Sequence, residues 1–239
     1  CYYLFLLKFA HVTNDNRVTA FVQLTLNQMA NGGIYDHLAG GFARYAVDEQ
    51  WKIPHFEKML YDNAQLISLY TAAFLKFKTP LYKQVAIETI DFCVKDFLQA
   101  GEGFQSAFDA DSEGVEGKYY CFSKEEIVHI LGNDAALFCS YFEITEQGNW
   151  EEDVNILHRK IPNEHIAESY NLSVEELSEK INLLKIQLLT YRKQRIKPAL
   201  DDKQLTSWNA LMIKALADAY LAFDNIEYLK TAVSTGDFI

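Results

Sequence analysis

The sequence predicts an all-α fold built from antiparallel helical hairpins, with small β-hairpins in the loops. Two observations lead to this fold class. Apolar residues recur at steps of three and four over several long stretches, as on one face of a helix. Strand-like patterns, in contrast, are short and isolated. Hydrophobic residues make up 49% of the 239-residue chain and aromatic residues 14%, which is enough for a sizeable core and indicates a globular protein.

Most of the expected helices begin at a recognisable start signal. Side-chain oxygens of Ser, Thr, Asp and Asn accept hydrogen bonds from the free amides of a first helical turn. Two signals are capping boxes, in which serine and glutamate satisfy backbone donors reciprocally. In order, helices are expected at the apolar residues 1–10, after Asn14 or Asp15 as far as Gly32, over Lys58–Phe77, from Thr79 and Pro80, after Ser123, from Ser173 to near Pro198, after Thr206 or Ser207, and near Asn225.

The expected strands lie in the loops between helices. Phe42–Val47 and Trp51–Ile53 flank the polar residues 48–50 and suit a small hairpin. Lys118–Phe122 is interpreted as another short strand.

Charge and cysteine content limit the classes of partner. The formal net charge of −11 disfavours nucleic acid, because phosphate backbones are repelled by an acidic surface. No run of about 18 apolar residues predicts a membrane span, and residues 1–10 lack the features of a signal peptide. We therefore expect a cytoplasmic protein with no nucleic-acid or membrane partner. The cysteines share no CxxC spacing and are interpreted as reduced, mostly buried thiols: Cys1, Cys93, Cys121 and Cys139.

Residues 31–63 hold more ionisable and aromatic side chains than a connecting loop needs. Arg44 and Tyr45 suit recognition of a carboxylate or of sugar hydroxyls. His55 can act as acid or base near neutral pH, with Glu57 close by. Taken singly, each residue fits a hydrogen-bonded plug, but burying the whole cluster would be costly unless it lines a wet site. The candidate substrate-binding residues here are Asp36, His37, Arg44, Tyr45, Lys58 and Asp62.

A second polar segment spans residues 106–120. Its acidic residues resemble the start of a calcium loop, but Tyr120 occupies the twelfth position, where a bidentate glutamate is required. The alternatives are an acidic turn that bonds its own backbone and a general acid or base opposite His55 or Glu57. We assign Asp109 and Asp111, with His55 and Glu57, as candidate catalytic residues.

Two residues complete the candidate set. Trp150 and Asp202 are assigned to substrate binding, although acids near Asp202 also suit simple capping of the following helix. The sequence contains no HExxH, Walker, GxGxxG or GxSxG motif, and we expect neither a cofactor nor a metal.

Three blocks of the sequence, residues 31–66, 108–120 and 201–217, resemble in this order the thioredoxin-domain-containing proteins related to spermatogenesis-associated protein 20. Ala39 and Phe108 depart from the usual glycine and a frequent glutamate. The resemblance implies a helical toroid of the six-hairpin glycosidase type, shared with N-acylglucosamine 2-epimerases, and a thioredoxin-like domain in the same full-length chain. Residues 1–239 would then be part of a single, incomplete (α/α) toroid domain, and an incomplete ring leaves apolar helix faces exposed.

Two functions follow from this reading. The first is a carbohydrate-binding or carbohydrate-modifying domain, epimerase- or hydrolase-like, that takes a sugar-like small molecule. The second is a non-catalytic module that binds a ligand or partner for the attached thioredoxin-like domain. An open polar cleft would favour the first, and polar residues closed on one another in ion pairs would favour the second. Whether the chain is an enzyme stays open.

Overall fold

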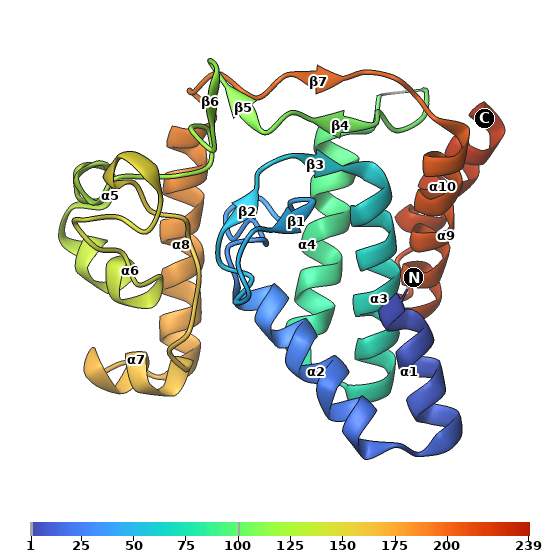
Figure 1. Ribbon diagram of the computed structural model, residues 1–239, viewed down its shortest axis with the longest axis horizontal. Helices are drawn as coiled ribbons and strands as arrows, with labels where there is room; N and C mark the ends of the chain where they lie inside the picture. Colours follow the sequence, from blue (N-terminus) through green and yellow to red (C-terminus); the bar gives the residue numbers. More distant parts are fainter. Residues whose placement is uncertain (1, 100) are drawn as a thin grey trace.

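The computed structural model describes residues 2–99 and 101–239. Three antiparallel helical hairpins form its larger part (Figure 1). The first helices of the hairpins lie side by side, with α3 between α1 and α9, and each is followed by a helix that returns beside it. This two-layer order is that of an open arc of an (α/α) toroid. The hairpins are α1 (Tyr2–Thr13) with α2 (Asn16–Asn31), α3 (Leu60–Phe77) with α4 (Pro80–Asp96), and α9 (Thr206–Phe223) with α10 (Ile226–Phe238).

A smaller helical lobe is inserted between α4 and α9. It lies to the left in Figure 1, and the long helix α8 forms its inner wall. Its core joins apolar residues of α5, α6, α7 and α8, and Leu38 from the loop after α2 reaches into it. The helices of this lobe are α5 (Lys124–Leu131), α6 (Ala135–Tyr141), α7 (Asn163–Ser169) and α8 (Val174–Arg192), with 3₁₀ turns at Gly132–Asp134 and Glu151–Asp153.

Short antiparallel strands cross the upper end of the hairpins (Figure 1). The three-stranded sheet has the order β3-β4-β7, so it ties the start of α3 to the segments before α5 and α9. The strands are β1 (Tyr45–Ala46) with β2 (Pro54–His55), β3 (Lys58–Met59) with β4 (Ala107–Phe108) and β7 (Leu200–Asp201), and β5 (Asp111–Ser112) with β6 (Val115–Glu116).

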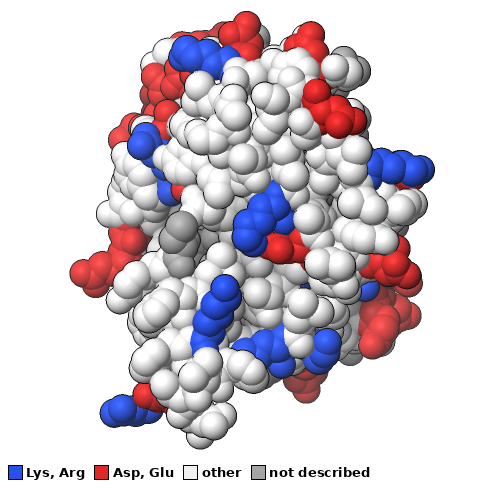
Figure 2. Space-filling model, turned by 90° about the vertical axis from the view of Figure 1, so that its right-hand side faces the viewer, with Lys and Arg blue, Asp and Glu red and all other residues white. Residues whose placement is uncertain are grey.

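Apolar side chains are exposed on one side of the arc. Figure 2 shows the side that carries α1, α9 and α10, where charged groups are scattered over a mostly uncharged surface. Tyr2, Phe5 and Val12 of α1 and Leu221 of α9 are each more than half exposed. Such surface is what an incomplete ring is expected to leave open. Among the described residues, no helix combines the length and apolar character needed to cross a membrane.

The predicted fold class, an all-α arc of helical hairpins with small β-hairpins, is confirmed. Both capping boxes are present, at Ser123 and Ser173, and Asp15 and Asn225 cap their helices as expected. Of the cysteines, Cys93 and Cys121 are buried, and Cys1 lies outside the described residues.

Two local predictions were wrong, one in full and one in the bounds of its strands. Lys118–Phe122 is not a strand, because amides 120 and 121 turn back to the Gly117 carbonyl and only Phe122 forms a β-bridge. The hairpin near residue 48 pairs Tyr45 with His55 and Ala46 with Pro54, because the Asp48 carboxylate accepts backbone amides as far along as Ile53 and widens the turn.

Some helices also begin or end at residues other than those predicted. Lys58 and Met59 form β3 before α3 begins, α8 ends at Arg192 instead of near Pro198, and Thr206 lies inside α9, whose N-cap is Leu205.

Candidate functional site

The three-stranded sheet separates two groups of polar residues. Lys58 of β3 pairs with Phe108 of β4, and Phe108 pairs with Leu200 of β7. Successive side chains of a strand point to opposite faces. Glu57 and Asp109, each one residue further along the same register, therefore lie on the face opposite to Lys58 and Phe108. The first face carries partly exposed acids, whereas the second borders a buried cluster of ions.

On the first face, the β1–β2 hairpin gathers four of the predicted residues. The Arg44 guanidinium binds the Glu57 carboxylate at 2.9 Å. The ring of Tyr45, which is 47% exposed, stacks on the ring of its cross-strand partner His55 at 4.9 Å. His55 Nε2 lies 3.9 Å from Glu57 Oε2. These four residues were predicted to share one site, and the fold brings them together.

His55 also has a partner that the sequence analysis missed. Its Nδ1 donates to Glu116 Oε1 at 2.8 Å, so the imidazole lies between two carboxylates. Glu116 belongs to β6, and the same oxygen accepts the Phe56 amide. The only signal for Glu116 in the sequence is its place in the second acidic segment. A histidine between carboxylates can accept and release a proton while its orientation is fixed.

Asp62, in the first turn of α3, has a perturbed acidity. Burial raises the pKa of its carboxyl to about 6, and the nearby Arg44 guanidinium offsets part of that effect. Its Oδ2 atom is buried without a hydrogen-bond partner. Beside it, Tyr61 meets Trp208 of α9 edge to face at 4.7 Å. A carboxyl that titrates near pH 6 is a candidate for proton transfer, because such perturbed values are frequent at functional sites.

The second face of the sheet borders an ion triad. Asp36 accepts two hydrogen bonds from Arg192, at 3.0 and 2.9 Å, and one from Lys58 Nζ at 2.9 Å. All three side chains are less than a tenth exposed. Lys58 Nζ also donates to the Gly40 carbonyl at 3.1 Å. Burial alone would raise the pKa of Asp36, but Arg192 and Lys58 hold it well below its usual range.

Because of the triad, Asp36 and Lys58 stabilise the fold in addition to being candidate substrate-binding residues. Breaking a buried pair of this kind leaves an uncompensated charge, which costs about 3–5 kcal/mol. Arg192 was not among the predicted site residues. A signal was available, because Arg192 falls on the same stripe as Leu184 and Leu188, the buried side of α8.

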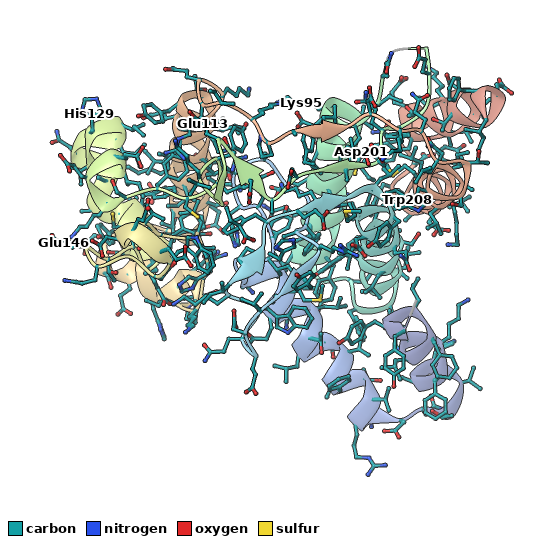
Figure 3. All side chains as sticks on the ribbon, turned by 45° about the horizontal axis from the view of Figure 1, so that its top comes forward. Lys95, Glu113, His129, Glu146, Asp201 and Trp208 are labelled. Carbon is teal, nitrogen blue, oxygen red and sulfur yellow. The ribbon has the colours of Figure 1, made fainter. Side chains whose placement is uncertain are left out.

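In the described part of the chain, no hydrogen bond or ion pair joins the remaining predicted residues to the cluster on the β1–β2 hairpin, although Asp109 neighbours Glu57 in the sheet register. His37 is buried, its Nε2 donates to the Gly32 carbonyl at 3.0 Å, and burial lowers its pKa to about 3. Asp109 accepts the Ala110 amide at 2.7 Å, as an acidic turn would. Asp111 is exposed in β5, and Asp202 is exposed after β7. Figure 3 shows Glu113 and Asp201, which mark these two segments, well separated along the strands. Whether Asp111, Asp202 and His37 bind a ligand stays a prediction.

Trp150 lines a cavity of about 560 Å³ beside the β5–β6 hairpin. Glu116, Tyr119 and Arg195 form other parts of its wall. The ring of Trp150 also packs edge to face on Phe56 at 5.9 Å. Because Glu116 binds His55, this cavity adjoins the cluster on the β1–β2 hairpin. Within residues 2–99 and 101–239, no three His, Cys, Asp or Glu side chains are arranged to hold a metal ion.

Comparison with known proteins identifies relatives over most of the chain. Uncharacterized protein B0495.5 of Caenorhabditis elegans is 36% identical over 98% of the chain. Spermatogenesis-associated protein 20 is 34% identical over 90% of the chain in Mus musculus and 35% over 81% in Homo sapiens. These proteins are homologues of the chain. The chain spans about a third of their length, namely 36%, 30% and 28%. The motif resemblance is thus confirmed for this part, and the thioredoxin-like domain stays a prediction.

The likeness to solved structures is weaker than the likeness to these relatives. No family model matches the chain. A crystal structure of D-mannose isomerase aligns with a TM-score of 0.33 and 17% identity, covering 92% of this chain and 52% of that one. A sugar epimerase from a ruminal bacterium aligns with a TM-score of 0.41 and 14% identity, covering 98% of this chain and 72% of that one.

Proposed function

We propose that the chain binds a carbohydrate in the cavity of about 560 Å³ that Trp150 and Glu116 line, next to the β1–β2 hairpin. The observation that carries the proposal is the contact between Glu116 and His55, because it joins an aromatic-walled cavity to a group that can transfer protons. Indole rings offer an apolar face to a sugar ring, and carboxylates accept hydrogen bonds from its hydroxyls. Concave sites with a few convergent polar groups are the usual place for small ligands.

The arrangement around His55 supports histidine-led proton transfer for a bound sugar. Glu116 fixes Nδ1, and Nε2 is left facing Glu57 at 3.9 Å. Arg44 holds the Glu57 carboxylate in place. An epimerase-like reaction would use His55 to move a proton at a carbon next to a carbonyl, whereas a hydrolase-like reaction would need two carboxyls across the sugar. Asp109, which shares a sheet face with Glu57, is the proposed second carboxyl in the latter case.

The test is a binding screen of the full-length protein against neutral mono- and disaccharides, including N-acetylated sugars, by isothermal titration calorimetry. We expect Trp150→Ala and His55→Ala to weaken binding at least tenfold, and Asp109→Ala to weaken it if that carboxyl faces the ligand. Trp208→Ala is the matched control, because Trp208 packs on Tyr61 away from the cavity. The proposal fails if no sugar binds, or if the control loses as much affinity as Trp150→Ala.

One observation favours the second function, a non-catalytic module. Arg44 pairs with Glu57 and His55 with Glu116, and the Asp36 triad is closed on itself, as expected when polar residues serve the scaffold. We infer for this case that the exposed Tyr45 ring contacts a partner, with the thioredoxin-like domain as the proposed one. Hydrogen exchange of residues 44–57 with and without that domain tests this alternative. Unchanged exchange would contradict it.

A further inference from the structure

A separate cavity of about 290 Å³ lies on the other face of the three-stranded sheet. The C-terminal ends of α4 and α8 flank it, and in Figure 1 both helices end just below the strands. Phe92, Phe108, Tyr119 and Tyr120 give it an aromatic wall, and Lys58 and Arg192 of the ion triad reach it from below. None of these contacts involves the β1–β2 hairpin or Trp150.

The charge of this cationic cavity is opposite to that of the whole chain. The chain carries a formal net charge of −11. The cavity, however, is lined by five cationic side chains and only two carboxylates, a surplus of three positive charges. A cavity whose charge has one sign raises the local concentration of ligands of the opposite sign. The cations are Lys58, Lys95, Arg192, Lys193 and Lys197, and the carboxylates are Asp36 and Asp96.

Ion pairs within the protein neutralise only part of this positive charge. Asp36 is shared by Lys58 and Arg192, and Lys197 binds Asp96 at 2.7 Å. Among the described residues, neither Lys95 nor Lys193 has a carboxylate within ion-pair distance. Burial lowers the pKa of Lys95, and repulsion from the neighbouring Lys193 ammonium group lowers it further. Figure 3 shows Lys95 at the upper end of α4, near β7.

A second observation points to a missing acceptor. The Arg192 side chain is only 3% exposed and lines the cavity. Its Nε atom is buried and has no hydrogen-bond partner. A buried donor without a partner costs about 1–3 kcal/mol. Cations at a helix C-terminus stabilise the helix dipole, and this accounts for one or two of them at each end. It does not account for their convergence from two helices on one cavity, nor for the unpaired Arg192 donor.

We propose that the cationic cavity binds the phosphate group of a phosphorylated small molecule. Lys95 and Lys193 would contact the phosphate at the mouth, and Lys58 and Arg192 would supply positive potential from the floor. The aromatic wall, chiefly Phe108 and Tyr120, would cover the apolar part of the ligand. The site differs from the sugar cavity proposed above, because Tyr119 is the one lining residue that the two cavities share and none of the five cations lines the sugar cavity.

Calorimetric titration of the full-length protein with inorganic phosphate, pyrophosphate and glucose 6-phosphate tests this proposal, with glucose as the uncharged comparison. We expect at least one phosphorylated probe to bind, and its affinity to fall at least tenfold in the double variant Lys95→Gln/Lys193→Gln. Both side chains are exposed, so the variant should fold. The matched control is Lys8→Gln/Lys230→Gln, which removes the same charge from exposed positions on α1 and α10.

Two results would overturn the proposal. One is the absence of binding by all three phosphorylated probes. The other is an equal loss of affinity in the two double variants, which would mean that phosphate responds only to the net charge of the protein. If glucose does not bind while a phosphorylated probe does, the result counts against the sugar site and not against this one. The two proposals can therefore fail separately.

Discussion

His37 illustrates how one buried residue couples the fold to pH. In the folded chain its pKa is lowered to about 3, because the imidazole is buried and near Lys185, although the Gly32 carbonyl opposes the shift. In the unfolded chain the pKa returns to its ordinary value of 6.5. Between these values the unfolded state binds a proton that the folded state does not. Stability is therefore lost as the pH falls from 6.5 towards 3, by up to about 1.4 kcal/mol per pH unit for each such group.

We predict that His37→Gln flattens the dependence of unfolding free energy on pH between 6.5 and 4. Glutamine keeps a donor for the Gly32 carbonyl but does not titrate. Urea denaturation at several pH values measures the slope, with the exposed His129→Gln as control. The raised pKa of Asp62 acts in the opposite sense, so the comparison is between variants and not of absolute slopes. An unchanged slope in His37→Gln would contradict the prediction.

At the scale of elements, helices were predictable because their signals are local. Ser173 and Glu176 are three residues apart, and their reciprocal hydrogen bonds form within one turn. The sheet β3-β4-β7 was not predictable in the same way. It joins pairs of residues that lie some fifty or ninety positions apart, such as Lys58 with Phe108 and Phe108 with Leu200, and each strand is too short for a periodic pattern.

The capping box of α8 gives a prediction at this scale. We expect Ser173→Ala to lower the free energy of unfolding by about 1 kcal/mol, because the Glu176 amide loses its acceptor. Urea denaturation measures the change. Ser234→Ala, an exposed serine inside α10, is the control and should leave stability unchanged or slightly higher, since alanine favours a helix. Equal effects of the two substitutions would show that the box contributes nothing measurable.

At the scale of the whole molecule, the site depends on contacts that no single segment reveals. Arg44, Tyr45, His55 and Glu57 lie within fourteen residues of sequence, and their grouping could be predicted from that stretch alone. Glu116 and Arg192 could not be placed, because they come from β6 and α8, which lie far along the chain from His55 and Asp36. Arg192 thus links α8 to the loop after α2, across the junction of the lobe and the arc.

We predict that Arg192→Met loosens this junction. Removing the guanidinium leaves Asp36 with Lys58 alone and should lower the free energy of unfolding by about 3–5 kcal/mol, as for other broken buried pairs. Amide hydrogen exchange should also accelerate at the end of α8 and in residues 36–41, where the Asp36 carboxylate accepts the Leu38 and Ala39 amides.

Arg17→Met is the matched control, because the Arg17–Asp15 pair has the same ion types but the Arg17 side chain is 94% exposed. Exposed pairs contribute about 0–1 kcal/mol, so this variant should stay close to the parent protein. If Arg192→Met were as stable as Arg17→Met, with unchanged exchange at residues 36–41, the triad would not hold the lobe to the arc. The apolar contacts of Leu38 with the lobe core would then be the main link.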